Sequence, residues 1–358
     1  MTTPRSELAR DAYATIPIYT PDETEYAIDL SDNSNQWGGP PTAERVMRES
    51  RESLARYPDT YSRMLKDALA EYAGVSSDNI VVGCGSDDVL DAAIRAFAEP
   101  GDKVAIIDPT FVMIPVFSKL NSLKPVMVPI TADYDVDVPA MLATNAKIMY
   151  LCSPNNPTGK PLKRESIEAV LQGAPGLVLI DEAYAEFAGA NCVDLVSKYD
   201  RLLIARTMSK AFGLAGLRIG YAIGASSLIR EVERSRGPYK VGRIAERAAV
   251  AALKNDLPWM QGIIAEAREN REKFRTALQA MGFKPLPSTT NFILLPIKDA
   301  VKVAADLRKK GISLRPFPKL ACAPGSDLAE TDGSAMRITI GKWDDMQKTL
   351  DALKEFTA

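Results

Sequence analysis

Short apolar runs alternate with longer segments over the first two thirds of the chain. The runs occupy residues 80–82, 103–107, 125–129, 147–151, 177–180 and 202–205. In the segments between them, such as residues 63–73, 110–120 and 164–172, apolar residues recur every three or four positions, which is the spacing of one helix face. Strands that are apolar throughout are buried on both faces. The pattern therefore predicts an α/β fold with a mainly parallel sheet between two layers of helices.

The pattern becomes more helical after Tyr221. Residues 244–254 are rich in alanine, and residues 260–281 have the charged and apolar spacing of a long amphipathic helix. Strands are predicted at residues 291–295, 312–315 and 336–340, and helices at residues 42–54, 301–310 and 344–356. We therefore expect an N-terminal arm over residues 1–28, a large domain over residues 29–252 and a smaller α+β domain over residues 253–358.

The composition narrows the class of protein. The chain has 358 residues, of which 46% are hydrophobic and 25% charged, and its net charge of -2 gives no sign of a nucleic-acid or anionic-membrane partner. No apolar run approaches the ~20 residues that span a bilayer, and the polar N-terminus lacks the apolar core of a secretory signal. The four cysteines are widely spaced and form no CxxC pair, which is typical of reduced thiols in a cytoplasmic protein.

Histidine is absent from the sequence. Its absence excludes Ser-His-Asp and Cys-His hydrolysis and all metal sites with histidine ligands. The cysteine spacing gives no zinc site either, so we expect no metal. Proton transfer must then be carried out by lysine, tyrosine, aspartate or glutamate.

Lys210 lies shortly after the apolar run 202–205, at a predicted junction between a strand and a helix. Hydroxyl groups precede it at Thr207 and Ser209, and Arg218 follows it. Such a lysine suits a cofactor that carries a carbonyl group and a phosphate, because the amine can form a Schiff base and the guanidinium can bind the phosphate. A solvated lysine and arginine beside a glycine-rich turn fit this pattern almost equally well, so the assignment depends on the rest of the chain.

A second phosphate site is predicted where the strand 80–82 meets Gly83-Cys84-Gly85-Ser86-Asp87-Asp88. A helix opens in this segment and runs to Ala98, and the free N–H groups and the dipole at its N-terminus favour an anion. The same glycines fit the start of a dinucleotide fold with Asp108 as the ribose ligand. Asp88 stands where that motif has its third glycine, which argues against a nicotinamide cofactor.

Candidate site residues follow three of the predicted strands. They are residues 153–159 after the run 147–151, residues 181–184 after the run 177–180, and Lys210 after the run 202–205. The active sites of parallel sheets gather at the carboxyl ends of the strands. We therefore expect these segments to meet at one edge of the sheet.

Pyridoxal 5'-phosphate is the cofactor that suits these residues together. Lys210 offers an amine for its aldehyde, and Asp181 offers a carboxylate that keeps the pyridine nitrogen protonated. Asn156 and Tyr184 can donate to the ring oxygen. Amides, hydroxyls and a cation for the phosphate are offered by Ser86, Asp87, Thr207, Ser209 and Arg218. Each residue also has a purely structural explanation, such as a helix N-cap for Asp87, and only their common position at strand ends favours the cofactor.

The sequence resembles the fold-type I aminotransferases, and most closely their histidinol-phosphate aminotransferase branch, from about Leu30 to Leu353. The motifs that carry the resemblance are Arg56-Tyr57-Pro58-Asp59, Gly85-Ser86-Asp87-Asp88, residues 153–159, Asp181-Glu182-Ala183-Tyr184, Ser209-Lys210, Arg218-Ile219-Gly220-Tyr221 and Arg337-Ile338-Thr339-Ile340-Gly341. The resemblance implies a three-layer pyridoxal-phosphate transferase fold. It also implies a homodimer in which Tyr57 reaches the phosphate in the neighbouring subunit.

The resemblance implies a role for each candidate at the cofactor. Lys210 is the Schiff-base lysine and the general base, and Asp181 is the partner of the pyridine nitrogen. Asn156 and Tyr184 are the partners of the ring oxygen, and Phe111 stacks on the ring.

The substrate side of the site contains two departures from the branch. The branch usually has Asn-Glu-Asn-Pro near the substrate entrance, where this chain has Asn33-Ser34-Asn35-Gln36, and Pro-Tyr-Asn where it has Pro238-Tyr239-Lys240. Asn33 is a candidate substrate contact. Arg315 and Arg337 end predicted strands and are expected to bind a phosphate or carboxylate between the domains, with Arg337 receiving the acidic group of the substrate by resemblance.

The predicted function is a pyridoxal-phosphate aminotransferase for histidinol phosphate, with glutamate and 2-oxoglutarate as the second pair. One alternative is an aminotransferase of the same branch that acts on an aromatic or other amino acid. Another is a decarboxylase of an amino acid phosphate, which the release of carbon dioxide would distinguish. Outside pyridoxal chemistry, the alternative is a nicotinamide-binding protein that uses Gly83 and Gly85.

Overall fold

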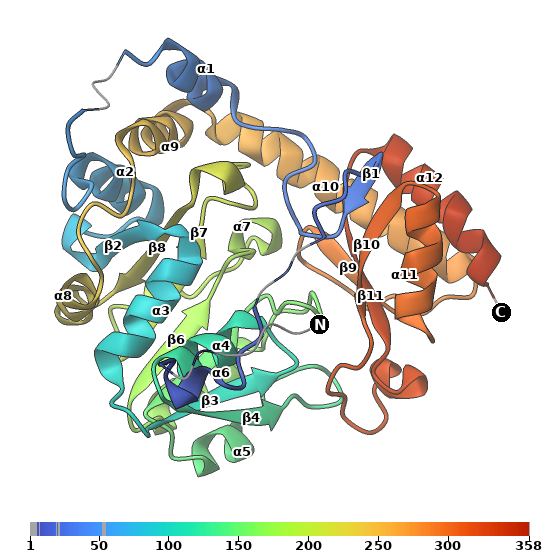
Figure 1. The fold of residues 1–358 in the computed structure, drawn as a ribbon, viewed down its shortest axis with the longest axis horizontal. Coiled ribbons are helices and arrows are strands. Elements are labelled where there is room, and N and C mark those ends of the chain that lie inside the picture. The colour runs from blue at the N-terminus through green and yellow to red at the C-terminus, as the bar shows by residue number, and fades with distance from the viewer. Residues whose placement is uncertain (1–5, 7, 19, 21, 52–54, 358) are drawn as a thin grey trace.

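The computed structural model describes residues 6, 8–18, 20, 22–51 and 55–357, and these form two sheets (Figure 1). The larger sheet has seven strands in the order β2-β8-β7-β6-β5-β3-β4. Their bounds are β2 Ile80–Cys84, β3 Lys103–Asp108, β4 Lys124–Pro129, β5 Ile148–Cys152, β6 Leu177–Asp181, β7 Leu202–Thr207 and β8 Ile219–Gly224. The strands from β7 to β4 are parallel, and β8 is antiparallel to both of its neighbours. The predicted mainly parallel sheet is confirmed.

Helices cover this sheet, and its central strands are shut off from solvent. Every residue of β5, β6 and β7 is buried, as expected for strands that consist almost entirely of apolar residues. The helices along this part of the chain are α2 Arg63–Ala73, α3 Gly85–Phe97, α4 Met113–Leu120, α5 Val138–Ala143, α6 Arg164–Gly173, α7 Ala185–Ala188 and α8 Ser226–Ser235. We call this sheet and its helices the large unit. The predicted α/β class is confirmed.

A second, smaller sheet has its own hydrophobic core. Its strands follow the order β1-β10-β11-β9, with β1 parallel to β10 and the other pairs antiparallel. The bounds are β1 Ile28–Leu30, β9 Phe292–Pro296, β10 Ile312–Phe317, β11 Ala335–Thr339, α11 Ala300–Lys309 and α12 Trp343–Leu353. Phe274, Leu295 and Ile338 are fully buried in this core. We call this part the small unit; Figure 1 shows it beside the large unit.

Three further helices complete the fold. They are α1 Pro41–Glu49, α9 Arg243–Asn255 and α10 Leu257–Ala280. Helices α1 and α9 pack on the core of the large unit, and α10 contributes to the cores of both units. Short 3-10 helices lie at Asp11–Tyr13, Ser77–Asn79, Val193–Leu195, Ala215–Leu217, Asp327–Thr331 and Lys354–Phe356. The domain division at residues 28 and 252 stays a prediction. A boundary after residue 28 divides β1, which pairs with β10 in the small sheet.

Two strands were not predicted from the sequence. β1 has only three residues, which is too short to give a periodic signal. β8 contains Gly220 and Gly224, and glycine is depleted in strands. Gly220 is required there for a different reason: a Cβ at this position would lie 2.1 Å from the Ser86 nitrogen. The strand therefore passes directly against the start of α3.

Two further predictions concern the ends of the chain and of a helix. The helix predicted over residues 42–54 ends at Glu49 in the structure, and residues 52–54 lie outside the described residues. In the N-terminal arm, Arg10 donates to the Leu120 carbonyl oxygen at 3.3 Å and to Ser122 Oγ at 2.6 Å, so this part of the arm lies on the large unit.

Within the described part of the chain, none of the helices has the length and apolar character that a membrane span requires.

Candidate active site

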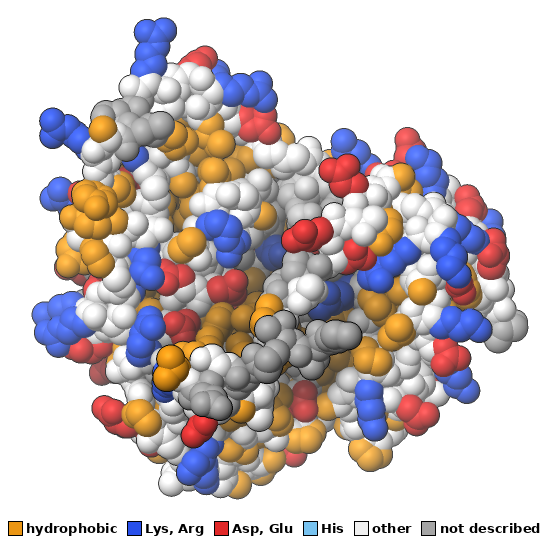
Figure 2. Space-filling model, viewed as in Figure 1, with side chains coloured by type: hydrophobic (Ala, Val, Ile, Leu, Met, Phe, Trp, Pro, Cys, Tyr) orange, Lys and Arg blue, Asp and Glu red, His pale blue; other side chains and the backbone are white. Residues whose placement is uncertain are grey.

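The carboxyl ends of β5, β6 and β7 lie side by side and carry the predicted polar segments. Cys152 is paired in register with Asp181, and Asp181 with Ala205. Asn156 follows β5, Asp181 is the last residue of β6, and Lys210 follows β7. Figure 2 shows the molecular surface hollowed between the large and small units, with hydrophobic, basic and acidic side chains on the walls.

Asp181 is a buried carboxylate that accepts hydrogen bonds from two donors. It is 3% exposed. Tyr150 Oη donates to its Oδ2 at 2.9 Å, and the Ala183 N–H donates to its Oδ1 at 3.0 Å. Burial raises the pKa of Asp181 to about 6, although both hydrogen bonds act in the opposite direction. The group therefore changes its charge close to the physiological range.

Lys210 is a half-buried amine whose pKa is lowered to about 8. Burial is the main cause, and the positive charge of Arg337 is the second; the carboxylates of Asp32 and Asp87 oppose them. Its Nζ donates to the Asp32 carbonyl oxygen at 3.2 Å. A neutral amine is therefore accessible at a mildly alkaline pH, which a nucleophile or general base requires.

The start of α3 and the residue Arg218 form a tight unit. Gly85 has φ 79°, a backbone conformation that favours glycine, and a Cβ there would lie 2.5 Å from Arg218 Nη2. The Gly85 N–H donates to the Arg218 carbonyl oxygen at 2.9 Å. Arg218 Nη2 lies 3.5 Å from Asp87 Oδ2, and the first turn of the helix contains Ser86 and Asp87. The geometry places a guanidinium beside a helix N-terminus, which is a favourable setting for an anion.

Thr207 and Ser209 stabilise the turn that carries Lys210. Thr207 Oγ1 donates to Ser209 Oγ at 2.9 Å, and the Ser209 N–H donates to Thr207 Oγ1 at 3.1 Å. Both residues are buried. The two hydroxyl groups lie together, between the end of β7 and Lys210.

Asn33 and Tyr184 meet across the junction of the two units. Asn33 Nδ2 donates to Tyr184 Oη at 2.9 Å, and Thr339 Oγ1 donates to Asn33 Oδ1 at 3.2 Å. The Asn33 carbonyl oxygen accepts a hydrogen bond from Asn291 Nδ2 at 3.0 Å. Burial raises the pKa of Tyr184, so the phenol stays neutral at ordinary pH. The side-chain amide of Asn33 is thus already bonded on both of its polar atoms.

Arg337 reaches from the small unit to the large one. It is 8% exposed, and its Nη1 donates to Asn156 Oδ1 at 2.8 Å while its Nη2 donates to the Ser31 carbonyl oxygen at 2.7 Å. Arg315 is paired in register with Arg337, so the two cations share one face of the small sheet. Arg315 is exposed, unlike Arg337. Like charges opposite each other are unfavourable unless an anion joins them, which supports an anion site here.

Two predicted residues lie outside this set of contacts. Phe111 is half-buried and packs against the core of the large unit. Tyr57 is 77% exposed, and its ring stacks on Tyr239 with centroids 4.7 Å apart. Lys240, one of the departures noted in the sequence, pairs with Asp88 at 2.6 Å in α3.

The sequence did not point to Tyr150 or to the carbonyl group of Asp32. Tyr150 belongs to an apolar run and is indistinguishable from a core residue by composition. The signal that could have found it is the alternation along β5, which puts Tyr150 and Cys152 on one face. Asp32 contributes a backbone atom, for which side-chain patterns give no signal.

The residues fit pyridoxal phosphate by their chemistry. The buried Asp181 keeps unused lone pairs for a protonated ring nitrogen, Lys210 supplies an amine with a lowered pKa, and Arg218 with the α3 N-terminus suits a phosphate. Gly85 leaves open the space that a Cβ would fill beside Arg218. The donor set therefore matches the ring nitrogen, the carbonyl group and the phosphate of the cofactor.

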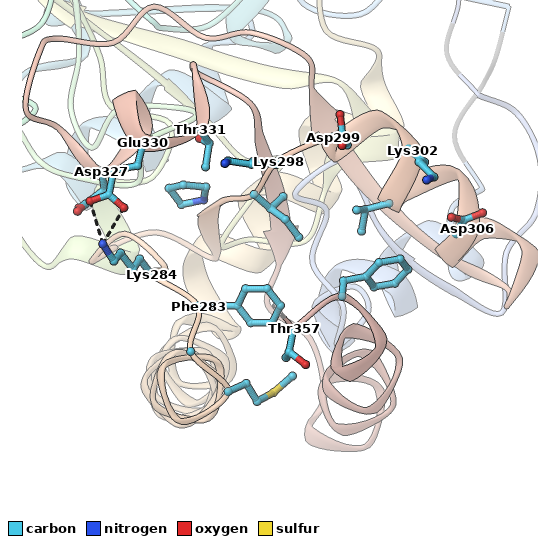
Figure 3. A pocket seen from close by; sticks show the side chains of 16 residues that line it. Phe283, Lys284, Lys298, Asp299, Lys302, Asp306, Asp327, Glu330, Thr331 and Thr357 are labelled. Carbon is cyan, nitrogen blue, oxygen red and sulfur yellow. Dashed lines mark hydrogen bonds and ion pairs between the residues drawn. The ribbon is translucent and has the colours of Figure 1, made fainter.

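A separate pocket of about 550 Å³ lies in the small unit and includes none of the predicted site residues. Figure 3 shows Phe283 and Thr357 next to each other on one wall of the pocket. Lys284 is bonded to Glu330, with Nζ 2.6 Å from Oε2. Lys298, Asp299 and Lys302 lie at its other wall. Because it contains neither the lysine nor the buried carboxylate described above, it is not the candidate active site.

Comparisons with known proteins agree on one family. Residues 26–353 match the family model for aminotransferase class I and II. The histidinol-phosphate aminotransferase of Microcystis aeruginosa is 33% identical over 97% of both chains, and that of Roseiflexus castenholzii is 37% identical over 92% of this chain and 90% of the other. The structure of histidinol-phosphate aminotransferase from Sinorhizobium meliloti in complex with pyridoxal-5'-phosphate has a TM-score of 0.88 at 26% identity, covering 99% of this chain and 98% of that one.

Proposed function

Because this chain belongs to the class I and II aminotransferases and is a pyridoxal-phosphate-dependent transferase, we propose that its amino donor is histidinol phosphate and its acceptor 2-oxoglutarate. The observation that carries the proposal is the buried Arg337, which lies beside Asn156 and shares a sheet face with Arg315. Histidinol phosphate and 2-oxoglutarate are both anionic, so one pair of guanidinium groups can serve both. The curated relatives named above support this donor.

Bound pyridoxal phosphate supplies a carbonyl carbon that takes up the donor amine and a ring that withdraws electrons from the carbon that loses its proton. We assign its phosphate to the N-terminus of α3, with Ser86 and Asp87, and to a cluster of Thr207, Ser209 and Arg218. Asp181 would pair with the ring nitrogen, Asn156 and Tyr184 with the ring oxygen, and Phe111 with the ring face. These roles agree with the contacts around Lys210, Asp181 and Arg337.

Lys210 is the proposed base. Its lowered pKa means that Nζ holds no proton in a large fraction of molecules at mildly alkaline pH. In this form it can take the proton from the donor carbon and return it to a neighbouring position, which is general acid–base catalysis by one amine. The Asp32 carbonyl oxygen accepts a hydrogen bond from the same Nζ and orients it.

We also propose that the active unit is a homodimer to which Tyr57 contributes across the interface. Tyr57 and Tyr239 form an exposed stacked pair, and Tyr61 and Met64 nearby in the sequence are exposed as well. Exposed aromatic residues of this kind are common at protein interfaces. The four free cysteines agree with a cytoplasmic location, which we propose for the enzyme.

The test is a panel of amino donors assayed with 2-oxoglutarate. Histidinol phosphate should be the best donor, and histidinol, which lacks the phosphate, is the matched control and should be poor. Efficient turnover of a neutral aromatic amino acid with histidinol phosphate inert would contradict the proposed donor and favour the aromatic alternative. Release of carbon dioxide without glutamate formation would instead indicate a decarboxylase.

A further inference from the structure

Tyr150 lies on the strand next to Asp181 and contacts its side chain. It is the middle residue of β5, its side chain is 0% exposed, and its Oη donates to Asp181 Oδ2 at 2.9 Å. Tyr150 is paired in register with Leu179, and Leu179 lies two residues before Asp181 in β6. Because side chains alternate along a strand, Leu179 and Asp181 share a face, and Tyr150 lies on it too. The contact thus follows from the register of the two strands.

The carboxylate of Asp181 is held at both oxygens. Oδ2 accepts a hydrogen bond from Tyr150, and Oδ1 accepts one from the Ala183 N–H at 3.0 Å. Each oxygen of a carboxylate has two lone pairs, so each retains one. Because the two donors bond to different oxygens, the carboxylate cannot rotate freely about its bond to Cβ. Its free lone pairs therefore keep one orientation.

We propose that Tyr150 is a positioning residue of the reaction: its hydroxyl fixes the Asp181 carboxylate so that the free lone pairs are presented to the pyridine nitrogen of the cofactor. The proposal rests on the role given to Asp181 in the proposed function. Tyr150 itself acts only through Asp181.

The charges around Asp181 give the hydroxyl a second effect. Burial raises the pKa of the carboxyl group, and the Tyr150 hydrogen bond is the leading influence against this shift. Burial also raises the pKa of Tyr150 itself, which therefore stays a neutral donor. The other ionisable groups near the carboxylate are Cys152, Asp87, Glu182 and Tyr184. Removing the hydroxyl should thus favour the protonated acid, which cannot stabilise a protonated ring nitrogen.

The test compares Tyr150→Phe with Tyr221→Phe. Tyr221 is also fully buried in the same sheet, and its hydroxyl lies near Arg206 and is not among the groups that influence Asp181, so it is a matched control for the loss of a buried hydroxyl. The first readout is the titration of the Asp181 carboxyl carbon by NMR in the cofactor-free protein. One lost hydrogen bond should raise that pKa by about one unit in Tyr150→Phe. Tyr221→Phe should leave it unchanged.

Two further readouts concern the holoenzyme. In Tyr150→Phe, the dissociation constant of pyridoxal phosphate should rise about tenfold, and the acid limb of the kcat profile should move to higher pH by the same shift. The KM of the amino donor should stay close to that of the parent enzyme. In the double variant with Asp181→Asn, Tyr150→Phe should cause little further loss, because both act through one carboxylate.

The outcomes separate this proposal from the proposed function. Equal Asp181 titration and cofactor affinity in Tyr150→Phe and Tyr221→Phe would overturn the role of Tyr150 alone. Normal turnover of Asp181→Asn would overturn the role of Asp181 and the assigned site.

If Tyr150→Phe does not fold, 3-fluorotyrosine at position 150 provides the test. As a stronger donor it should lower the pKa of Asp181, and an unchanged value would reject the proposal.

Discussion

Burial and a neighbouring cation set the chemistry of Lys210. Its pKa is lowered to about 8, first by burial and then by Arg337, so its amine should react with pyridoxal in the cofactor-free protein with a midpoint near pH 8. In Arg337→Gln the midpoint should move to higher pH, because a positive charge that disfavours the ammonium form is lost. Peptide mapping after borohydride reduction should place the label on Lys210.

Arg315→Gln is the control for this titration. Arg315 is exposed and is not among the charges that influence Lys210. The Arg315→Gln variant should leave the midpoint of the reaction with pyridoxal unchanged. A midpoint above pH 10 in the parent protein would show that Lys210 is a solvated lysine and not the predicted amine.

Asp181→Asn should preserve the fold and abolish most of the activity. The amide oxygen can still accept one hydrogen bond, but an uncharged group cannot keep the pyridine nitrogen protonated. We expect kcat to fall by at least about a hundredfold with little change in the melting temperature. Steady-state kinetics and thermal unfolding measure the two effects. A variant with near-normal kcat would contradict the proposed role.

Arg337→Ala should impair both half-reactions, since we propose that donor and acceptor share the anion site. Each lost charge-assisted contact should raise the activation free energy by about 2 kcal/mol, which lowers kcat/KM roughly thirtyfold. Arg315→Ala should have a smaller effect, because Arg315 is exposed whereas Arg337 is bonded to Asn156. Single-turnover measurements with histidinol phosphate and with 2-oxoglutarate test each half-reaction. Loss of one half-reaction only would argue against a shared site.

At the scale of elements, the contact between β8 and α3 supports the proposed phosphate site. Gly220→Ala would place a Cβ 2.1 Å from the Ser86 nitrogen and 2.2 Å from the Gly85 carbonyl carbon, and these are backbone atoms that cannot rotate away. We expect a loss of about 1–3 kcal/mol in the free energy of unfolding and weaker cofactor binding. Urea unfolding and cofactor titration measure these changes.

Gly262→Ala is the matched control for this substitution. Gly262 lies inside α10, and a Cβ there would meet nothing within 4 Å. Alanine is favoured over glycine in a helix interior, so this variant should gain about 0.5–1 kcal/mol. Equal stability of the two variants would show that β8 can move away from α3.

The elements that the sequence predicted well are those with an uninterrupted pattern. The helix 63–73 was found at Arg63–Ala73, because its apolar spacing is regular and Gly74 ends it with φ 70°. β8 was missed because glycine weakens its strand pattern, and Gly220 serves a contact with α3 that no local pattern reveals. Asp181 and Lys210 could be predicted as candidates because each follows an apolar run. Tyr150 was not predicted, because alternation along β5 indicates only which face it lies on, and the pairing of β5 with β6 is needed to give it Asp181 as a partner.

At the scale of the whole molecule, the proposed homodimer makes a prediction about mixed subunits. If Tyr57 acts in the neighbouring subunit, a dimer of Lys210→Ala and Tyr57→Phe chains contains one site with both native residues. Mixing the two variants should therefore restore sites with the parent affinity for pyridoxal phosphate. Sedimentation should show a dimer. Sites that keep the weaker affinity of Tyr57→Phe, or an active monomer, would reject the arrangement.

The pairing of β1 with β10 has a consequence for the order in which the protein can assemble during synthesis. Residues 28–30 leave the ribosome early, but their partner strand begins only at Ile312. Contacts between segments so distant in sequence form late, because the intervening chain must first be closed into a loop. The small sheet therefore gains its edge strand only after β10 has emerged, whereas every strand of the large sheet is complete by Gly224. Nascent chains should acquire the large sheet first and remain without the Arg337 side of the candidate active site until β10 and β11 have been synthesised.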